Sequence, residues 1–346
     1  MRANYRMLGD YIQPVDIRNS DLKVSHLLGL SIEKCFIESI ANTIGTDFSK
    51  YKIVRKGQFT YIPDTSRRGD KIGIALLTDF DEGLVSNIYT VFEITDTTKL
   101  LPEYLMLWFS RPEFDRYARY KSHGSVREIF DWDEMCRVEL PVPDLKEQEK
   151  IVNTYNAITR RINLLHRINE KLEMVGQCLF EETIKQKEKN AKLKDIAEIN
   201  SGKRPEEMTQ GNFPLVGAGD IMGYISNFNY DGKTLVIGRV GTHGKVQRFS
   251  EKCWCSDNTL TIKSKLYEYT YFILKNIDYS LLNRGATQPL ITQTDIRDFD
   301  IFYSENEIKK FEDVTSKIML RFDNNYREIQ KLQKLKQLII TRMSKS

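Results

Sequence analysis

The chain has 346 residues, of which 40% are hydrophobic and 29% are charged. This is the composition of an ordinary globular protein of about two domains, which excludes the disordered and fibrous classes. No run approaches the roughly 18 apolar residues that span a bilayer, and no signal-peptide core stands at the N-terminus, so we expect a cytoplasmic protein without a membrane partner. The formal net charge of +4 does not by itself identify a nucleic-acid partner.

The five cysteines do not indicate disulfides or a metal site. Cys35, Cys136, Cys178, Cys253 and Cys255 are odd in number and lack the paired spacing of zinc ligands, so we expect reduced, structural thiols. Cys253-Trp254-Cys255 could form half of a metal site, but alternation within a strand explains this run better.

The first globular segment opens on Leu8–Ile12 and continues in short alternating runs. Runs rich in β-branched and aromatic residues predict strands at Gln58–Ile62 and Tyr89–Ile94. From Pro102 to Tyr120 the aromatic and leucine residues have helical spacing, and we interpret them as core contacts. The segment is therefore predicted to be mixed α and β.

Basic residues are concentrated between Lys50 and Gly73, where seven of them face two acidic residues. Lysine and arginine interleaved with Gly, Thr, Gln and Tyr in loops suit phosphate contact for affinity and hydrogen bonding to base edges for sequence. A solvated charged face is the competing interpretation. The predicted DNA contacts in this segment are Lys52, Arg55, Lys56, Arg67, Arg68 and Lys71.

A long helix is predicted at residues 144–189, because this stretch has no proline and only one glycine, Gly176. Apolar residues recur there in steps of four and three, which is the spacing of a heptad seam. The polar Asn169 at a seam position suits a structure that fixes helix register at some cost in stability. The predicted seam is Ile151, Tyr155, Ile158, Ile162, Leu165, Asn169, Leu172 and Leu179.

The same order of elements then recurs. Leu193–Ala197 repeats Leu8–Ile12 at an offset of 185 residues, strands are predicted at Thr234–Ile237 and Thr259–Ile262, and a helical stretch runs from Leu266 to Leu282. A second long helix follows at residues 304–346. Its predicted seam, in register with the first at an offset of 160 residues, is Phe311, Ile318, Phe322, Ile329, Leu332 and Ile339.

The two long helices are expected to bury their seams against each other. Helices of about 42 residues would be roughly 60 Å long, more than one compact domain needs. We predict an antiparallel coiled coil with the globular segments at opposite ends; folding back onto each helix's own segment, or pairing with another chain, is the alternative. The predicted fold class is α+β, with mixed α/β domains at 1–143 and 190–303 and spacer helices at 144–189 and 304–346.

A second basic segment lies between Asp231 and Lys265, with seven basic residues against three acidic ones. The glycines of Gly238–Gly244 lack the order of a phosphate loop, and a hairpin that presents the intervening side chains is the better interpretation. His243 has no neighbouring nucleophile or carboxylate motif, so we predict hydrogen bonding rather than base catalysis. The predicted DNA contacts in the second copy are Lys233, Arg239, Thr242, His243, Lys245, Arg248, Thr287 and Gln288.

No active-site motif is found in the sequence. G-x-S-x-G, H-E-x-x-H and the proline pair that amino-methyltransferases use beside the target base are all missing. Glu147 and Glu149 suggest a nuclease cluster, but acids at a helix start are explained by the helix dipole. We predict no catalytic residue, no metal and no cofactor bound by this chain. A methyltransferase or nuclease with its own activity, and a purely structural coiled-coil scaffold, remain as alternatives.

With these residues in view, the chain resembles the specificity subunit of type I restriction-modification enzymes over essentially its whole length. The sequence motifs on which the resemblance rests are Leu140–Pro143 leading to Glu147–Ile151, Gly285–Gln288 before the second long helix, and Phe213–Gly217 followed by Ile237–Gly244. The chain departs from the family's pattern at Ile301–Glu307, where the proline and Glu-Gln phrase is replaced, and at Gly124–Arg127, which stands in place of the Gly-Ala-Thr-Gln turn.

The resemblance implies two target-recognition domains, each for one half of a split DNA sequence, with the helix pair as a spacer. It implies double-stranded DNA, two modification (methyltransferase) subunits and restriction (translocase and nuclease) subunits as partners. S-adenosylmethionine, ATP and Mg²⁺ are then expected on those partner subunits. Because the second globular segment is shorter and has different loops, an asymmetric DNA target is expected.

Overall fold

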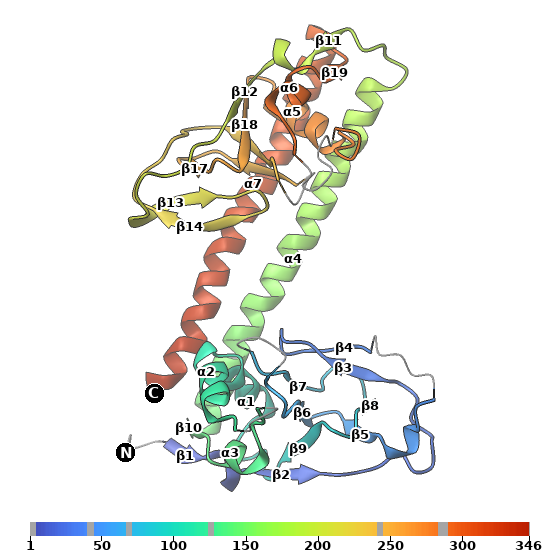
Figure 1. Cartoon of the computed structure of the whole chain (residues 1–346), viewed down its shortest axis with the longest axis vertical. Coiled ribbons are helices and arrows are strands. Elements are labelled where there is room, and N and C mark those ends of the chain that lie inside the picture. The colour runs from blue at the N-terminus through green and yellow to red at the C-terminus, as the bar shows by residue number, and fades with distance from the viewer. Residues whose placement is uncertain are drawn as a thin grey trace. The chain divides into compact units, whose positions relative to one another are not determined.

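In the computed structural model the chain divides into two units, residues 1–162 with 330–346 and residues 163–329. The structure describes residues 5–39, 45–66, 71–123, 128–240, 245–282 and 290–345. Each unit combines a β-rich globular part with segments of two long helices, α4 (Leu145–Ile184) and α7 (Glu305–Arg342) (Figure 1). The predicted α+β class with two packed long helices is confirmed.

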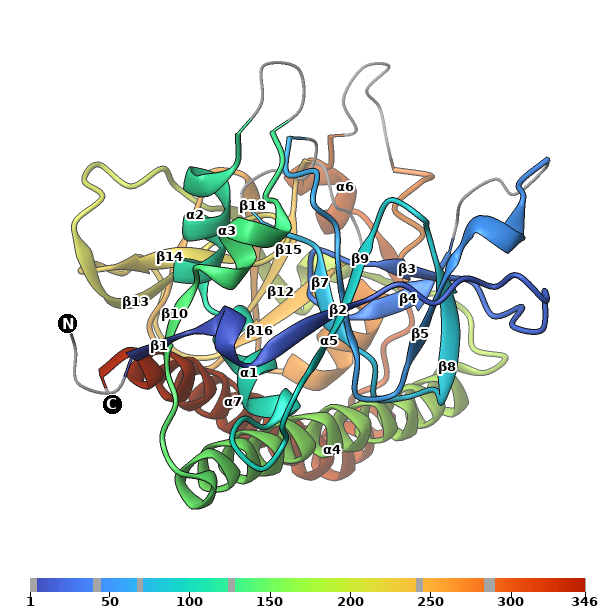
Figure 2. The ribbon, with the colours of Figure 1, turned by 90° about the horizontal axis from the view of Figure 1, so that it is seen from below.

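The first unit is built around a four-stranded antiparallel sheet in the order β2-β9-β6-β7, part of which is seen in Figure 2. Phe59 of β6 and Phe92 of β9 stack at 4.9 Å between ring centroids, and Phe109 of α1 meets both rings edge-on. The elements are β1 (Tyr5–Met7), η1 (Leu8–Asp10), β2 (Ile12–Val15), β3 (Leu28–Leu30), β4 (Phe36–Glu38), η2 (Phe48–Lys50), β5 (Lys52–Arg55), β6 (Phe59–Tyr61), β7 (Ile74–Leu76), β8 (Glu82–Val85), β9 (Thr90–Ile94), α1 (Pro102–Phe109), α2 (Pro112–Lys121), α3 (Trp132–Cys136) and β10 (Glu139–Pro141).

The second unit contains a sheet with the order β12-β18-β15-β16 and a smaller sheet with the order β14-β13-β17. Its core gathers around Tyr269 and Phe272 of α5, both buried. The elements are β11 (Ala191–Lys192), η3 (Leu193–Asp195), β12 (Ala197–Ser201), β13 (Gln210–Val216), β14 (Ile221–Ile225), β15 (Thr234–Gly238), β16 (Val246–Phe249), β17 (Trp254–Cys255), β18 (Thr259–Ser264), α5 (Tyr267–Lys275), α6 (Gln293–Arg297) and β19 (Asp300–Ile301); η4 (Met343–Lys345) follows α7 in the first unit.

The two sheets confirm the predicted repeat, because β2, β9, β6 and β7 correspond in order and pairing to β12, β18, β15 and β16. The repeated opening forms a single 3-10 turn in both copies. Its leucine is fully buried in each, and the backbone N–H groups of Leu8 and Leu193 donate to the carbonyls of Val138 and Phe299 at 2.8 and 2.9 Å. The repeated local sequence therefore makes the same backbone contact in both copies.

The helical stretch predicted at Pro102–Tyr120 is wrong in one respect, since it forms two helices. Arg111 is extended, with φ −78° and ψ 137°, and α2 starts at the next residue, Pro112. A proline disfavours helical geometry in the residue before it and suits the first position of a new helix, which explains the break. The stretch predicted at Leu266–Leu282 is helical only over Tyr267–Lys275.

Within each unit the segments of α4 and α7 lie side by side (Figures 1 and 2). In the second unit Phe180 meets Phe311 at 6.2 Å between rings, and the Asn169 side chain donates to the carbonyl of Phe322 at 3.2 Å. In the first unit the Lys336 ammonium lies 4.7 Å from the Tyr155 ring. Partner numbers fall along α7 as they rise along α4, which is the antiparallel pattern that we predict from the sequence.

The predicted seam positions face inward to different degrees. Ile158, Ile162, Leu165, Asn169, Phe311 and Ile329 are buried, and Ile151, Tyr155, Leu172, Leu179, Ile318, Phe322, Leu332 and Ile339 are half-buried. Phe180, Met319 and Ile340, each next to a predicted position, are more deeply buried because they join the cores of the globular parts. The helices therefore pack both on each other and on their own globular parts, a combination of the two arrangements considered from the sequence.

In each copy a polar side chain of the long helix bonds the backbone at the start of a short helix, and the two side chains are placed one turn apart. The buried Gln148 of α4 accepts from the N–H of Leu101 at 2.9 Å and donates to the carbonyl of Lys99 at 2.8 Å. At the repeat offset, Ile308 of α7 is apolar, and Glu312 accepts from the N–H of Tyr269 at 2.7 Å instead. Both side chains satisfy N–H groups at a helix start, which have no partner within their own helix.

Candidate nucleic-acid interface

Of the described residues predicted to contact DNA, four belong to corresponding hairpins of the two sheets and four lie outside them: Lys71, Arg239, Lys245 and Arg248 on the hairpins, and Lys52, Arg55, Lys56 and Lys233 elsewhere. In the first unit β6 and β7 flank the loop of residues 62–73, and in the second β15 and β16 flank residues 239–245. The antiparallel pairing of β15 with β16 confirms the predicted hairpin. Arg67, Arg68, Thr242 and His243 lie outside the described residues.

A second segment reaches the base of each hairpin. Asp64 is bridged to Ile129 in the first unit, and Val240 is bridged to Leu290 in the second. The bridged residues adjoin 124–127 and 283–289, the latter containing Thr287 and Gln288, which lie outside the described residues. In both copies the fold therefore brings the base of the hairpin next to a residue just after these ranges, Ile129 in the first unit and Leu290 in the second.

The turn between β5 and β6 presents Lys56 to solvent. Gly57 has φ +85°, and the N–H of Gln58 donates to the carbonyl of Arg55 at 2.9 Å, so a glycine is favoured at this place in the turn. Arg55 is 54% exposed beside Glu82 at 3.9 Å. Lys52 is more enclosed, because its side chain is 14% exposed and pairs with Asp16.

Lys71 opens onto a cleft of about 840 Å³ that the sequence pattern did not reveal. Lys71 itself pairs with Glu33 at 2.8 Å. Helix α2 adds Arg116, Arg119 and the 81% exposed Tyr120 to the same cleft. Their spacing of three and four residues places them on one helix face, which is the signal that could have found them.

A buried ion pair underlies this cleft. The side chains of Lys34 and Asp115 are 8% and 10% exposed and lie 2.7 Å apart. Burial lowers the pKa of Lys34, although the Asp115 carboxylate acts in the opposite direction. Asp115 also accepts from the N–H of Ile72, beside Lys71, so the pair fixes the end of the basic loop to α2.

Three predicted contacts of the second unit remain accessible to a ligand. Lys233 is 56% exposed near Glu268, and Lys245 is 52% exposed, 3.6 Å from Asp220. Arg239 follows β15 and is half-buried; its Nε is buried without a hydrogen-bond partner among the described residues. Its backbone is held by hydrogen bonds to Asn258 and Ile291.

The prediction that Arg248 contacts DNA is corrected by the structure. Its side chain is 5% exposed and is bound by Glu268 at 2.7 Å and Asp323 at 2.9 Å. Burial alone would disfavour the charged guanidinium, but the hydrogen bonds from Asp323 and Glu268 outweigh it, so the pKa of Arg248 is raised. A side chain that is 5% exposed and bound by two carboxylates is not available to contact DNA.

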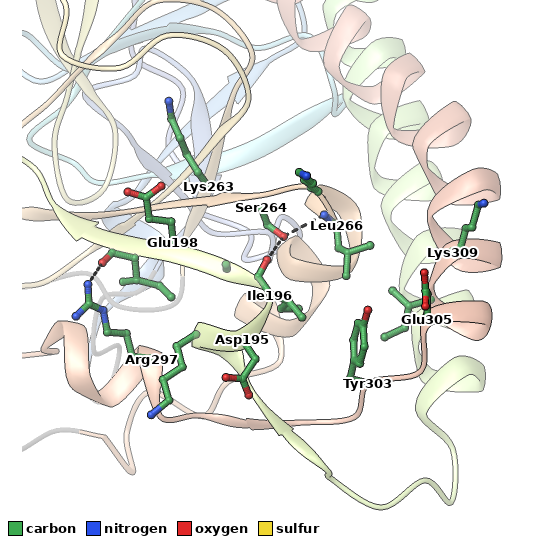
Figure 3. Close-up of a pocket in the computed structure, with 15 residues that line it drawn as sticks. Asp195, Ile196, Glu198, Lys263, Ser264, Leu266, Arg297, Tyr303, Glu305 and Lys309 are labelled. Atoms are coloured by element: carbon green, nitrogen blue, oxygen red, sulfur yellow. Dashed lines mark hydrogen bonds between the residues drawn. The ribbon is translucent and has the colours of Figure 1, made fainter.

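A pocket of about 850 Å³ lies elsewhere in the second unit, between β12, β18 and the start of α7 (Figure 3). In Figure 3 the Arg297 guanidinium is bonded to a carbonyl, that of Ile199 at 2.7 Å, and Ser264 joins Ile196 to Leu266. Lys194 is paired with Asp298 at 2.8 Å. None of the predicted DNA contacts lines this pocket.

Cys253, which directly precedes β17, and Cys255 at its end alternate with Trp254, as predicted from the sequence. Cys253 and Cys255 are fully buried, and their sulfurs lie 3.8 Å apart. The Trp254 side chain between them turns outward and donates to the carbonyl of Lys203. Among the described residues, no group of three or more His, Cys, Asp or Glu side chains is arranged to hold a metal, and no helix has the length and apolarity to cross a membrane.

Comparison with known proteins gives one consistent family. The model of the type I restriction modification DNA specificity domain matches the chain twice, at residues 10–174 and 186–338. The specificity subunit of the type I restriction enzyme HindI from Haemophilus influenzae is 27% identical over 175 residues. That stretch covers 46% of this chain but only 37% of the relative, so the similarity spans well under half of that protein.

A solved structure shows the same fold. The S subunit of a type I restriction-modification system from M. genitalium aligns with a TM-score of 0.62 over 98% of this chain and 95% of that chain. The two sequences are 14% identical, so the likeness concerns the fold alone. Two β-rich domains and a pair of long packed helices are thus shared features.

Proposed function

The chain belongs to the type I restriction-modification DNA specificity family, as a specificity subunit rather than a catalytic one, and we propose that each of its globular domains reads one half of a bipartite DNA target. The observation that carries this proposal is the repeated sheet with a basic hairpin at the corresponding place in both copies. Two similar reading surfaces on one chain suit a target with two half-sites.

The domain limits that we propose are 1–143 and 190–303 for target recognition, with spacer helices at 144–189 and 304–346. Contacts to phosphates supply affinity, and contacts to base edges supply sequence specificity. Arg248 is removed from the contact set by its burial, and the cleft residues of α2 are added. The proposed contacts are Lys52, Arg55, Lys56, Arg67, Arg68, Lys71, Arg116, Arg119, Tyr120, Lys233, Arg239, Thr242, His243, Lys245, Thr287 and Gln288.

The two half-sites should differ in sequence. The first unit carries an α2 cleft with two arginines and an exposed tyrosine, whereas the second carries the small β14-β13-β17 sheet beside its hairpin. Side chains of different kind and placement select different base edges. We therefore propose an asymmetric target, which mapping of methylated adenines in the host would reveal together with its spacer.

The helix pair would set the spacer length and dock two modification subunits, with restriction subunits completing the complex in the cytoplasm. S-adenosylmethionine, ATP and Mg²⁺ would then be bound by those partners. Co-expression of the chain with a modification subunit of its own system, followed by purification through one tag, tests the docking. Recovery of the tagged chain alone would contradict it.

The decisive experiment for a reading subunit separates binding from chemistry. The purified chain is incubated with duplex DNA, Mg²⁺ and S-adenosylmethionine, and cleavage, methyl transfer and binding are followed in parallel. We expect salt-dependent binding without turnover, because counterions are released when lysines and arginines neutralise phosphates. Turnover by the pure chain would overturn the assignment in favour of a catalytic protein, and the absence of binding would favour a scaffold.

A further inference from the structure

The reading hairpin of the second unit is attached directly to a long helix by Arg248 of β16. Its Nε and Nη2 donate to the two oxygens of Asp323 on α7 at 2.9 and 3.0 Å, and its Nη1 donates to Glu268 of α5 at 2.7 Å. A guanidinium that bonds both oxygens of a carboxylate is fixed in position and in plane. One side chain thus ties the hairpin, α5 and α7 together.

Aromatic rings enclose this junction. The Arg248 guanidinium lies 4.9 Å from the Tyr267 ring, 4.6 Å from the Tyr271 ring and 5.9 Å from the Phe322 ring. Water is largely excluded from Arg248 and Glu268, whose side chains are 5% and 2% exposed, while the Asp323 side chain is 21% exposed. In such surroundings charge-assisted hydrogen bonds are strong and poorly replaced by solvent, so the hairpin has little freedom to tilt on α7.

The sheet itself does not require this arginine. In the second sheet Leu235 of β15 lies between Arg248 and Ile262, and in the first sheet Phe59 of β6 lies between Leu76 and Phe92. The place of Arg248 is therefore taken in the first copy by Leu76, which packs in the apolar core. Leucine carries no charge, so among the described residues an ionic attachment at this position of the sheet is found in the second unit alone.

We infer that Arg248 and Asp323 are positioning residues that fix the angle of the second reading hairpin on the spacer helix, and thereby the register at which the second half-site is accepted. The inference rests on the proposed function. Lys245, a proposed DNA contact, directly precedes β16, so a tilt of this strand displaces Lys245 with it. Adjacent base pairs are separated by about 3.4 Å along the duplex, so a small tilt suffices to admit a neighbouring register.

The test measures spacer discrimination by the chain in complex with its modification subunits. The probes are duplexes with both half-sites, identified by adenine-methylation mapping, whose spacer is native, one base pair shorter or one base pair longer. D323N removes the bidentate bond but leaves Arg248 paired with Glu268. R248K keeps the charge but not the planar fork. D313N and R321K, at exposed positions of the same helix, are the matched controls.

We expect D323N and R248K to reduce the affinity ratio between native and altered spacers by about 3- to 30-fold, with a smaller loss on the native probe. Thermal melting of each complex reports whether the second unit stays folded. If D323N does not fold, R248K carries the test. If a folded D323N or R248K complex kept the wild-type affinity ratio between native and altered spacers, the inference would be overturned but the proposed function would stand. Failure of the wild-type complex to prefer the mapped target would overturn the proposed function and the inference with it.

Discussion

Arg239 and Arg248 belong to the same hairpin but meet different surroundings. Arg239 directly follows β15 and is half-buried, and its Nε has no hydrogen-bond partner among the described residues. Arg248 is enclosed by Glu268 and Asp323. A desolvated donor without an acceptor gains most from a ligand that supplies one, which favours Arg239 as a base-reading side chain.

Substitution of Arg239 by alanine should weaken binding of the mapped target by about 1 to 3 kcal/mol, because a bidentate contact to a base edge would be lost. Fluorescence anisotropy with a labelled duplex measures the change, and R321A, on an exposed face of α7, is the control. An unchanged binding curve for R239A would remove this arginine from the interface.

Glu312 should make the second unit sensitive to pH. Burial, with repulsion from the nearby Glu268, raises the pKa of Glu312 to about 7 from an ordinary value of 4.5. Between these values the folded state holds a proton that the unfolded state releases, so the contribution to stability is complete below about pH 4.5 and is lost as the pH rises through about 7.

The urea midpoint of the second unit should therefore fall as the pH rises from about 4.5 to about 7, and E312Q should flatten this fall because its side chain does not ionise. The N–H of Tyr269 keeps an acceptor in the glutamine variant. D313N, at an exposed neighbouring position, should retain the wild-type slope. Equal slopes in E312Q and wild type would show that another group titrates.

At the scale of elements, the two long helices share one buried polar contact. The Asn325 amide donates to Asn169 at 2.8 Å, and Asn169 donates to the carbonyl of Phe322 at 3.2 Å. These bonds form only when the two residues lie opposite each other. The pair therefore fixes the register of α4 against α7 at the expense of apolar packing.

N169A should lower the free energy of unfolding by about 1 to 3 kcal/mol, because Asn325 keeps a buried amide without its acceptor. The double variant N169L/N325L should recover most of that loss, since both polar partners are replaced by apolar ones. Urea denaturation of both variants measures the effect, with N163A at an exposed position of α4 as control. A double variant as unstable as N169A would mean that leucine cannot be packed there.

The sequence predicts the elements well where periodicity is local. The strands at Thr234 and Thr259, both long helices and the duplicated order follow from spacing alone. Burial within a helix is harder to predict: Phe180 is 3% exposed, whereas the heptad pattern favours Leu179. The heptad describes packing on another helix, but α4 also packs on Phe272, whose ring leaves no room for a side chain at Gly176.

The candidate site is predicted in outline but not in detail. Exposed Lys56 and buried Arg248 look alike in a basic run, because the partners of Arg248 lie 20 and 75 residues away in the sequence. Only the fold brings Glu268 and Asp323 to the same side chain. Likewise, Arg116 is separated by α1 and three strands from the loop with which it shares a cleft.

At the scale of the whole molecule, affinity for DNA should be distributed over both domains. The logarithm of the binding constant is expected to fall linearly with the logarithm of salt concentration, with a slope of about −0.9 for each neutralised phosphate. K56A should reduce the magnitude of this slope by about one and weaken all sequences alike. Lys146 is exposed on α4, outside the proposed interface, and K146A should leave the slope unchanged. A slope near zero for the wild type would exclude phosphate-driven binding.

The ion pair between Arg248 and Asp323 also decides which foreign domains this chain can accept. Suppose that the second β-rich domain is exchanged for one from a relative with an apolar residue at the place of Arg248, as Leu76 provides in the first sheet. The recipient helix would then keep the Asp323 carboxylate, whose side chain is 21% exposed, with no cation to neutralise it, which is costly for a charge largely shielded from water. Such a chimera needs a matching change on α7 itself, so new specificities are transplanted most easily among relatives that share the same residue pair.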